Sequence, residues 1–214
     1  MNMYWDETFL KLRNQQVLRE QLDTTENEES WMLITTEQAV EEIPHGALAL
    51  PEGQKISFHP VTLLDGDLTL HLPVSWIPET PAQQASRKPG SWTLRDKEQG
   101  ILLGIHHSEQ ELLPAQVEEY QEHLLRQMER AQPAMMRVEE KLIPLQDIHV
   151  HGYTCVFPVL PTPYLQIGFV RSWRERSFMV SCQFKLEQAS MWTPIIYAIF
   201  RTATWAERAD MANP

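Results

Sequence analysis

The stretch YLQIGFVRSWRERSFMVSCQFKL, residues 164–186, decides the fold because it predicts a long β-hairpin. In its first arm, Leu165, Ile167 and Phe169 alternate with polar or small residues, and the second arm shows the same period of two. Such a period places each apolar set on one face of a sheet. A hairpin this long needs more strands, or a helix over its apolar face, to be stable. We therefore expect the rest of the chain to supply a larger sheet with covering helices.

The predicted turn of this hairpin, residues 171–176, is rich in arginine and contains a tryptophan that we expect to be exposed. Guanidinium groups suit carboxylates and phosphates. The sequence leaves three interpretations of this turn. It could be a solvated turn, a binding site for an acidic partner, or a binding site for the acidic segment of the same chain. Interface energy concentrates in Trp, Tyr and Arg, so a partner is expected at the turn or on the apolar sheet face. The candidate partner-binding residues are Trp173, Arg171, Arg174 and Arg176 at the turn, and Leu165, Ile167 and Phe169 on the sheet face.

The charge of the chain is strongly uneven. The 214 residues carry a net charge of −11 and are 43% apolar, which is enough for a substantial core. Residues 20–52 hold nine carboxylates and no lysine or arginine, so the acidity belongs mainly to one segment. This balance disfavours a broad basic surface, and we expect no nucleic-acid partner.

Membrane and export signals are not apparent in the sequence. No apolar run approaches 18 residues, so no membrane span is expected. The start, MNMYWDETFLKLRNQQ, has no basic stretch followed by an apolar block, so we expect no secretory signal and a cytoplasmic location. Cys155 and Cys182 lie in apolar stretches without CxxC spacing, which indicates buried free thiols; a disulfide or redox pair is the alternative.

The N-terminal part predicts an extension. Residues 4–22 predict a helix with Trp5, Phe9 and Leu12 on one stripe, which would pack on its own domain, pack across a homodimer, or bind a partner. Residues 23–30 are polar and acidic, as in a linker. We therefore divide the chain into an N-terminal helix and acidic linker at 1–52, an α+β domain at 53–208, and a tail at 209–214.

The α+β domain is predicted from alternating patterns and turn signals. Asp65-Gly66 marks a hairpin turn, residues 115–131 show the period of an amphipathic helix, and Thr35 or Thr36 is expected to cap a short helix that ends near Ile43. The expected strands are 56–64, 68–72, 91–95, 101–106, 136–143 and 153–159, and the expected terminal helix is 190–202. The fold class predicted is α+β: an antiparallel sheet of about six strands with helices on both faces, plus an N-terminal helical extension.

The order of these segments resembles the Mog/PsbP/DcrB-like superfamily. The residues that carry the resemblance are Leu68–Trp76 (LTLHLPVSW), Val117–Met128, Gly152-Tyr153, the 165–184 hairpin and Trp192–Ile199. The nearest branch is the bacterial cytoplasmic one that includes type VI secretion effector-associated chaperones, which bind apolar N-terminal segments of effectors. The resemblance implies a non-catalytic protein that binds another polypeptide, as a chaperone or adaptor.

Motifs that would carry catalysis or bind a metal are not found. The histidines do not form HExxH, and the two cysteines form no cluster, so no metal site or cofactor is expected. GxSxG, P-loop and GxGxxG patterns are missing, and no catalytic residue is predicted. The alternative is a small-molecule-binding protein or an enzyme with a pocket between sheet and helix. A closed pocket with convergent polar groups would favour that alternative, and an open apolar groove would favour protein binding.

Overall fold

The computed structural model describes residues 33–79, 90–145, 148–159 and 161–206. The predicted helix at 4–22, the linker at 23–30 and the tail at 209–214 lie outside these residues. The described helices are α2 (Thr36–Glu42), α4 (Val117–Ala131) and α5 (Ala189–Arg201). None of the helices within these ranges is long and apolar enough to cross a membrane.

The strands form two antiparallel sheets. The larger has the order β4-β5-β6-β10-β9-β8-β7 and the smaller has the order β1-β2-β3-β11. The strands of the larger sheet are β4 (Ile77–Pro78), β5 (Ser91–Asp96), β6 (Ile101–Glu111), β7 (Met136–Leu145), β8 (Ile148–Phe157), β9 (Tyr164–Trp173) and β10 (Arg176–Lys185). Those of the smaller sheet are β1 (Ala47–Ala49), β2 (Lys55–Leu63), β3 (Leu68–Pro73) and β11 (Thr204–Trp205). The predicted α+β class is confirmed, with the strands divided between two sheets rather than joined in one.

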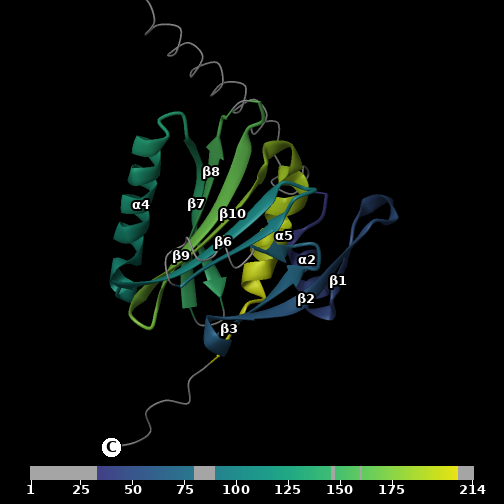
Figure 1. Ribbon diagram of the computed structural model, residues 1–214, viewed down its shortest axis with the longest axis horizontal. Helices are drawn as coiled ribbons and strands as arrows, with labels where there is room; N and C mark the ends of the chain where they lie inside the picture. The colour runs from purple at the N-terminus through teal and green to yellow at the C-terminus, as the bar shows by residue number, and fades with distance from the viewer. Residues whose placement is uncertain (1–32, 80–89, 146–147, 160, 207–214) are drawn as a thin grey trace, which may run out of the picture.

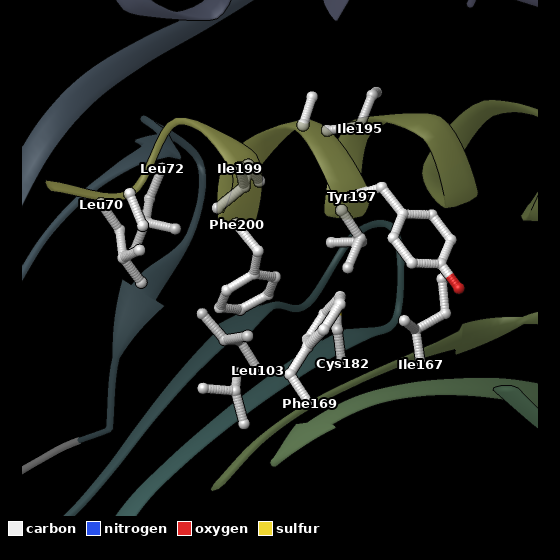
Figure 2. Close-up of a cluster of buried hydrophobic side chains, with 14 of the residues drawn as sticks. Leu70, Leu72, Leu103, Ile167, Phe169, Cys182, Ile195, Tyr197, Ile199 and Phe200 are labelled. Carbon is white, nitrogen blue, oxygen red and sulfur yellow. The ribbon is translucent and has the colours of Figure 1, made fainter. Parts of the chain in front are cut away.

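The two long helices cover opposite faces of the larger sheet, as predicted (Figure 1). On the α5 side, Phe200 points toward Phe169 of β9, and their ring centroids lie 4.2 Å apart (Figure 2). Leu70 and Leu72 of β3 complete this core, which joins the two sheets. Full burial of a leucine or phenylalanine side chain contributes about 1.5–3 kcal/mol. The α5 side therefore provides most of the hydrophobic stabilisation.

A smaller core lies between α4 and the other face of the sheet. Leu125 of α4 is fully buried there against Tyr153 and Cys155 of β8. Gln121, also buried, donates its side-chain N–H to the carbonyl of Gly152 at 3.1 Å. This bond and the apolar contacts fix α4 over strands β8 and β9.

Both cysteines are free and buried, as predicted. Cys182 belongs to the α5 core, whereas Cys155 belongs to the α4 core, so the two thiols lie on opposite faces of one sheet. Burial raises the pKa of the Cys155 thiol to about 12 and also raises the pKa of Cys182. The separation by the sheet explains why these thiols do not pair.

Several local predictions are confirmed. The Thr35 hydroxyl caps α2 by accepting the backbone N–H of Gln38 at 3.1 Å. The turn between β2 and β3 uses positive φ at Asp65 and Gly66, as the Asp-Gly signal predicts, and also at Leu64, which the sequence predicts to end the preceding strand.

The described residues that precede residue 52 contribute to the core on the α5 side. Ile34, Ala39, Ile43 and Leu48 join the same apolar cluster as α5. Segment 34–48 is therefore built into the main body of the protein through this shared cluster.

Candidate functional site

The face of the larger sheet that carries α4 is only partly covered. Helix α4 lies over β8 and β9, and the adjoining surface of β5, β6 and β10 forms the floor of a groove beside the helix. This recess has a volume of about 410 Å³. Its lining includes half-buried side chains such as Met128 and Tyr164 and the exposed Gln132, so it opens to solvent.

One side of this recess is apolar. Leu124 and Met128 lie four residues apart on α4 and therefore share a helix face. Met179 of β10 faces them across the floor, and the Tyr120 hydroxyl donates to its sulfur at 3.6 Å. Phe157 of β8 extends the apolar lining. Methionine and aromatic side chains adapt to varied apolar ligands.

The floor is polar. The Ser91 hydroxyl and Nδ1 of His106 lie 2.7 Å apart and belong to cross-strand partners of β5 and β6. Next to them, the Gln183 side chain donates to Gln166 at 2.7 Å, and Gln166 donates to the Tyr153 hydroxyl at 3.2 Å. Burial raises the pKa of Tyr153 to about 12, so it stays neutral at ordinary pH. The floor thus offers hydrogen-bonding groups, and the described residues that line it include no carboxylate, lysine or arginine.

A second recess, also of about 410 Å³, continues along the same helix toward the end of β6. It shares Leu124 with the first recess, and Tyr120 and Glu119 contribute to its lining, together with Glu111 of β6. We call the two recesses together the α4 groove. It follows α4 from Gln116 to Gln132, which corresponds to about 24 Å at the rise of an α-helix.

The described residues contain no group of three or more His, Cys, Asp or Glu side chains placed to hold a metal ion. The Ser91–His106 pair places a hydroxyl against an imidazole, but its partners are ordinary cross-strand neighbours. The α4 groove therefore combines features of both hypotheses: it is open with an apolar side, and it has convergent polar groups.

The hairpin turn is shorter than predicted. Strand β9 continues through Trp173 and β10 begins at Arg176, so only Arg174 and Glu175 form the turn, with φ of 54° and 58°. Two residues with positive φ match the twist of the flanking strands. Arg174 is exposed and pairs with Asp67, in the turn between β2 and β3, at 2.5 Å, and Arg176 is also exposed.

Arg171 and Trp173 are not the exposed tip that the sequence analysis expects. Arg171 is only 4% exposed, and its guanidinium lies 5.1 Å from the ring of Trp173 and 4.2 Å from that of Trp205. Trp173 is half-buried against Trp205. The reason is the period of two: both residues are in phase with Ile167 and Phe169, and β11 covers that face.

The Arg171 charge is poorly compensated. Its Nε donates to the carbonyl of Ser172 at 3.1 Å, while its buried Nη1 has no hydrogen-bond partner among the described residues. Burial lowers the pKa of Arg171 to about 10.

The predicted apolar docking face is also enclosed. Leu165, Ile167 and Phe169 are 6%, 0% and 2% exposed, because α5 packs on them. They are core residues in this structure and are not accessible to a partner. The groove residues were missed by the sequence reasoning, although Met179, Ser181 and Gln183 alternate along β10 with its apolar side chains. These alternate residues of β10 point away from the α5 core, and their more polar character is the sequence signal for the less covered face of the sheet.

No protein-family model matches the sequence. No curated protein matches it either. Among solved structures, the cyanobacterial PsbP of Synechocystis is similar, with a TM-score of 0.56 and 9% identity; the match covers 74% of this chain and 98% of that protein.

Two further structures are less similar. A mutant of the protein Mog1 matches with a TM-score of 0.47 and 12% identity over 72% of this chain and 98% of that one. A protein of Bacteroides thetaiotaomicron matches with a TM-score of 0.48 and 9% identity over 71% of this chain and 49% of that one. The likeness to the cyanobacterial PsbP shows that this chain has a PsbP-like fold.

Proposed function

We propose that this protein is a non-catalytic binding module that receives a segment of another polypeptide in the α4 groove. The observation that carries the proposal is the groove itself: an open trough along α4, with an apolar side at Leu124 and Met128 and a polar floor. A length of about 24 Å accommodates about seven residues of an extended chain at 3.3 Å per residue.

The chemistry of the groove fits a polypeptide. Apolar side chains of the ligand would pack against Leu124, Met128 and Met179, and its backbone groups would bond to Ser91, His106 and Gln183 on the floor. Glu111 and Glu119, which are exposed in the second recess, favour a segment with basic residues nearby. The preferred ligand is therefore an apolar segment with basic flanks.

A chaperone or adaptor role in the cytoplasm, for an effector of type VI secretion, is the specific form of this proposal. Its support is the resemblance carried by Leu68–Trp76 and the segments that follow it. An apolar segment of an effector is the class of ligand that the apolar side of the groove would protect from water.

The test compares two charge substitutions on one helix. Met128→Glu places a carboxylate in the groove, and Arg130→Glu places one on an exposed position two residues away. A partner is first identified by pull-down from the source cell, then purified and titrated calorimetrically against each variant. We expect at least a tenfold weaker affinity for Met128→Glu and nearly unchanged affinity for Arg130→Glu, because burying an unpaired charge is costly.

Undiminished binding by Met128→Glu would exclude the groove. The variant Trp173→Ala/Arg174→Glu would then test the hairpin turn, which the sequence predicts as a partner-binding site.

A second candidate function is that of a small-molecule-binding protein or enzyme. It is favoured by the Ser91–His106 pair and by the hydrogen-bonded chain Gln183–Gln166–Tyr153. A turnover that is lost in His106→Ala would establish that alternative and overturn the non-catalytic function.

A further inference from the structure

The described chain begins close to one end of the α4 groove. The backbone N–H of Leu33 donates to the carbonyl of Ser190 in the first turn of α5 at 3.1 Å. Only the short turn Leu186–Gln188 separates β10 from α5, and Leu186 donates its N–H to Pro163 just before β9. Leu33 is therefore held at the end of the larger sheet where β10 finishes and β9 starts.

The same end of the sheet carries part of the groove lining. Tyr164 is the first residue of β9 and Gln183 lies near the end of β10, and both line the recess beside α4. Leu33 thus lies on the α5 side of the sheet, next to the ends of β9 and β10. On the opposite side of the sheet, these strand ends line the groove.

The length of that chain is sufficient to pass around the sheet. Residues 23–32 span up to about 33 Å when extended, whereas stacked layers of secondary structure lie only about 10 Å apart. Residues 4–22, with their predicted apolar stripe of Trp5, Phe9 and Leu12, come before this tether. As a helix they would be about 28 Å long, comparable to the groove beside α4.

We propose that residues 4–22 are a ligand of the α4 groove of their own chain and compete there with another polypeptide. Their apolar stripe pairs with Leu124 and Met128, and the cations Lys11 and Arg13 suit the exposed Glu111 and Glu119. A ligand joined to its binding site through a short stretch of the same chain has an effective concentration in the millimolar range. A partner must therefore compete with it, and the groove selects polypeptides that bind more strongly than this internal ligand.

The test uses the full chain with a photoreactive benzophenone amino acid in place of Phe9. Illumination of dilute protein is expected to give a product of monomer mass, with the cross-link on residues 117–132 or on β10. The matched control carries the same group in place of Asn14, which lies on the opposite side of the predicted helix, and should give little of this product. Adding Met128→Glu to the Phe9-substituted protein should reduce the yield at least fivefold.

Other cross-linking patterns would overturn the inference. A cross-link to residues on the α5 side, or equal yields from positions 9 and 14, would remove residues 4–22 from the groove. A product of dimer mass would assign the groove to a second copy of the chain. The inference assumes the proposed polypeptide groove, but cross-linking needs no partner. The two experiments can therefore give different answers. The cross-link can be missing although a partner binds in the calorimeter, or it can form although no partner binds.

Discussion

The backbone N–H of Leu33 donates to the carbonyl oxygen of Ser190 at 3.1 Å, and this carbonyl is the one to which residue 194 would donate if it were not proline. A helical residue normally donates its N–H to the carbonyl four residues earlier, and proline has no N–H. From the sequence, Pro194 is expected within the first turn of its helix. It is instead the sixth residue of α5, and a segment distant in sequence supplies the missing hydrogen bond.

Replacing Pro194 with alanine should release Leu33. The new N–H at position 194 would bond to Ser190 and compete with the Leu33 N–H, whose bond contributes about 1 kcal/mol. We expect amide hydrogen exchange at Leu33 to become about fivefold faster, as measured by NMR. The amide of Gly46, bonded to Ile43 within its own turn, serves as the internal control. Unchanged protection at Leu33 would show that Pro194 does not determine this contact.

Removing the buried charge of Arg171 should not destabilise the protein. Its Nη1 is buried without a partner among the described residues, so Arg171→Met removes an unfavourable desolvation and loses about 1 kcal/mol of interaction with the indole rings. We expect the free energy of unfolding in urea to stay equal or to rise by up to about 2 kcal/mol. Arg176→Met, at an exposed position, should change it by less than about 0.5 kcal/mol. A clear loss of stability in Arg171→Met alone would contradict this account.

Acid should loosen the contact between α4 and β7. Arg137 of β7 donates to Glu122 at 2.6 Å and to Glu129 at 2.7 Å, both on α4. Hydrogen bonds from Arg137 and then Arg126 hold the pKa of Glu122 below its usual value of 4.5. A carboxyl whose pKa is lowered by folding stabilises the folded state above its unfolded pKa and loses that contribution as the pH falls through the folded pKa.

The unfolding free energy of the natural protein should therefore fall more steeply below pH 4.5 than that of Arg137→Met. Urea titrations between about pH 6 and pH 3 measure the difference. Arg130→Met, an exposed substitution on the same helix, is the control and should keep the natural slope. Parallel pH profiles for Arg137→Met and the natural protein would exclude this ionic contact as a source of stability.

Two glycines on either side of β10, Gly168 of β9 and Gly104 of β6, should respond differently to alanine. A Cβ at Gly168 would lie 2.0 Å from the ring of Tyr153, whereas a Cβ at Gly104 would meet its nearest atom, the Ser181 hydroxyl, at an ordinary 3.5 Å. Tyr153 is buried and hydrogen-bonded to Gln166, so it has little room to move. We expect Gly168→Ala to lower the unfolding free energy by about 1–3 kcal/mol.

Gly104→Ala should be nearly neutral or slightly stabilising, because alanine restricts the unfolded chain more than glycine does. Thermal unfolding of the two variants side by side provides the measurement. Equal losses at both positions would show that strand propensity, rather than contact with Tyr153, controls the effect.

The sequence by itself determined the elements whose signals are local. The alternation in residues 164–186 produced the β9–β10 hairpin, the Asp65-Gly66 turn joined β2 to β3, and Thr35 capped α2. The period of the apolar residues in 115–131 located α4. These predictions succeed because hydrogen bonding within a turn or helix and the direction of neighbouring side chains depend on residues close together in the chain.

Tertiary structure alone decided which of the two hairpin faces is covered, and by what. Leu165 and Arg171 share a face by alternation, but only the packing of α5 and the return of Trp205 in β11 make that face inaccessible. The α4 groove likewise exists because α4 covers β8 and β9 and leaves part of β6 and β10 open. Such burial depends on contacts between segments far apart in sequence. A local pattern can therefore predict an apolar face, but it cannot predict which element covers that face.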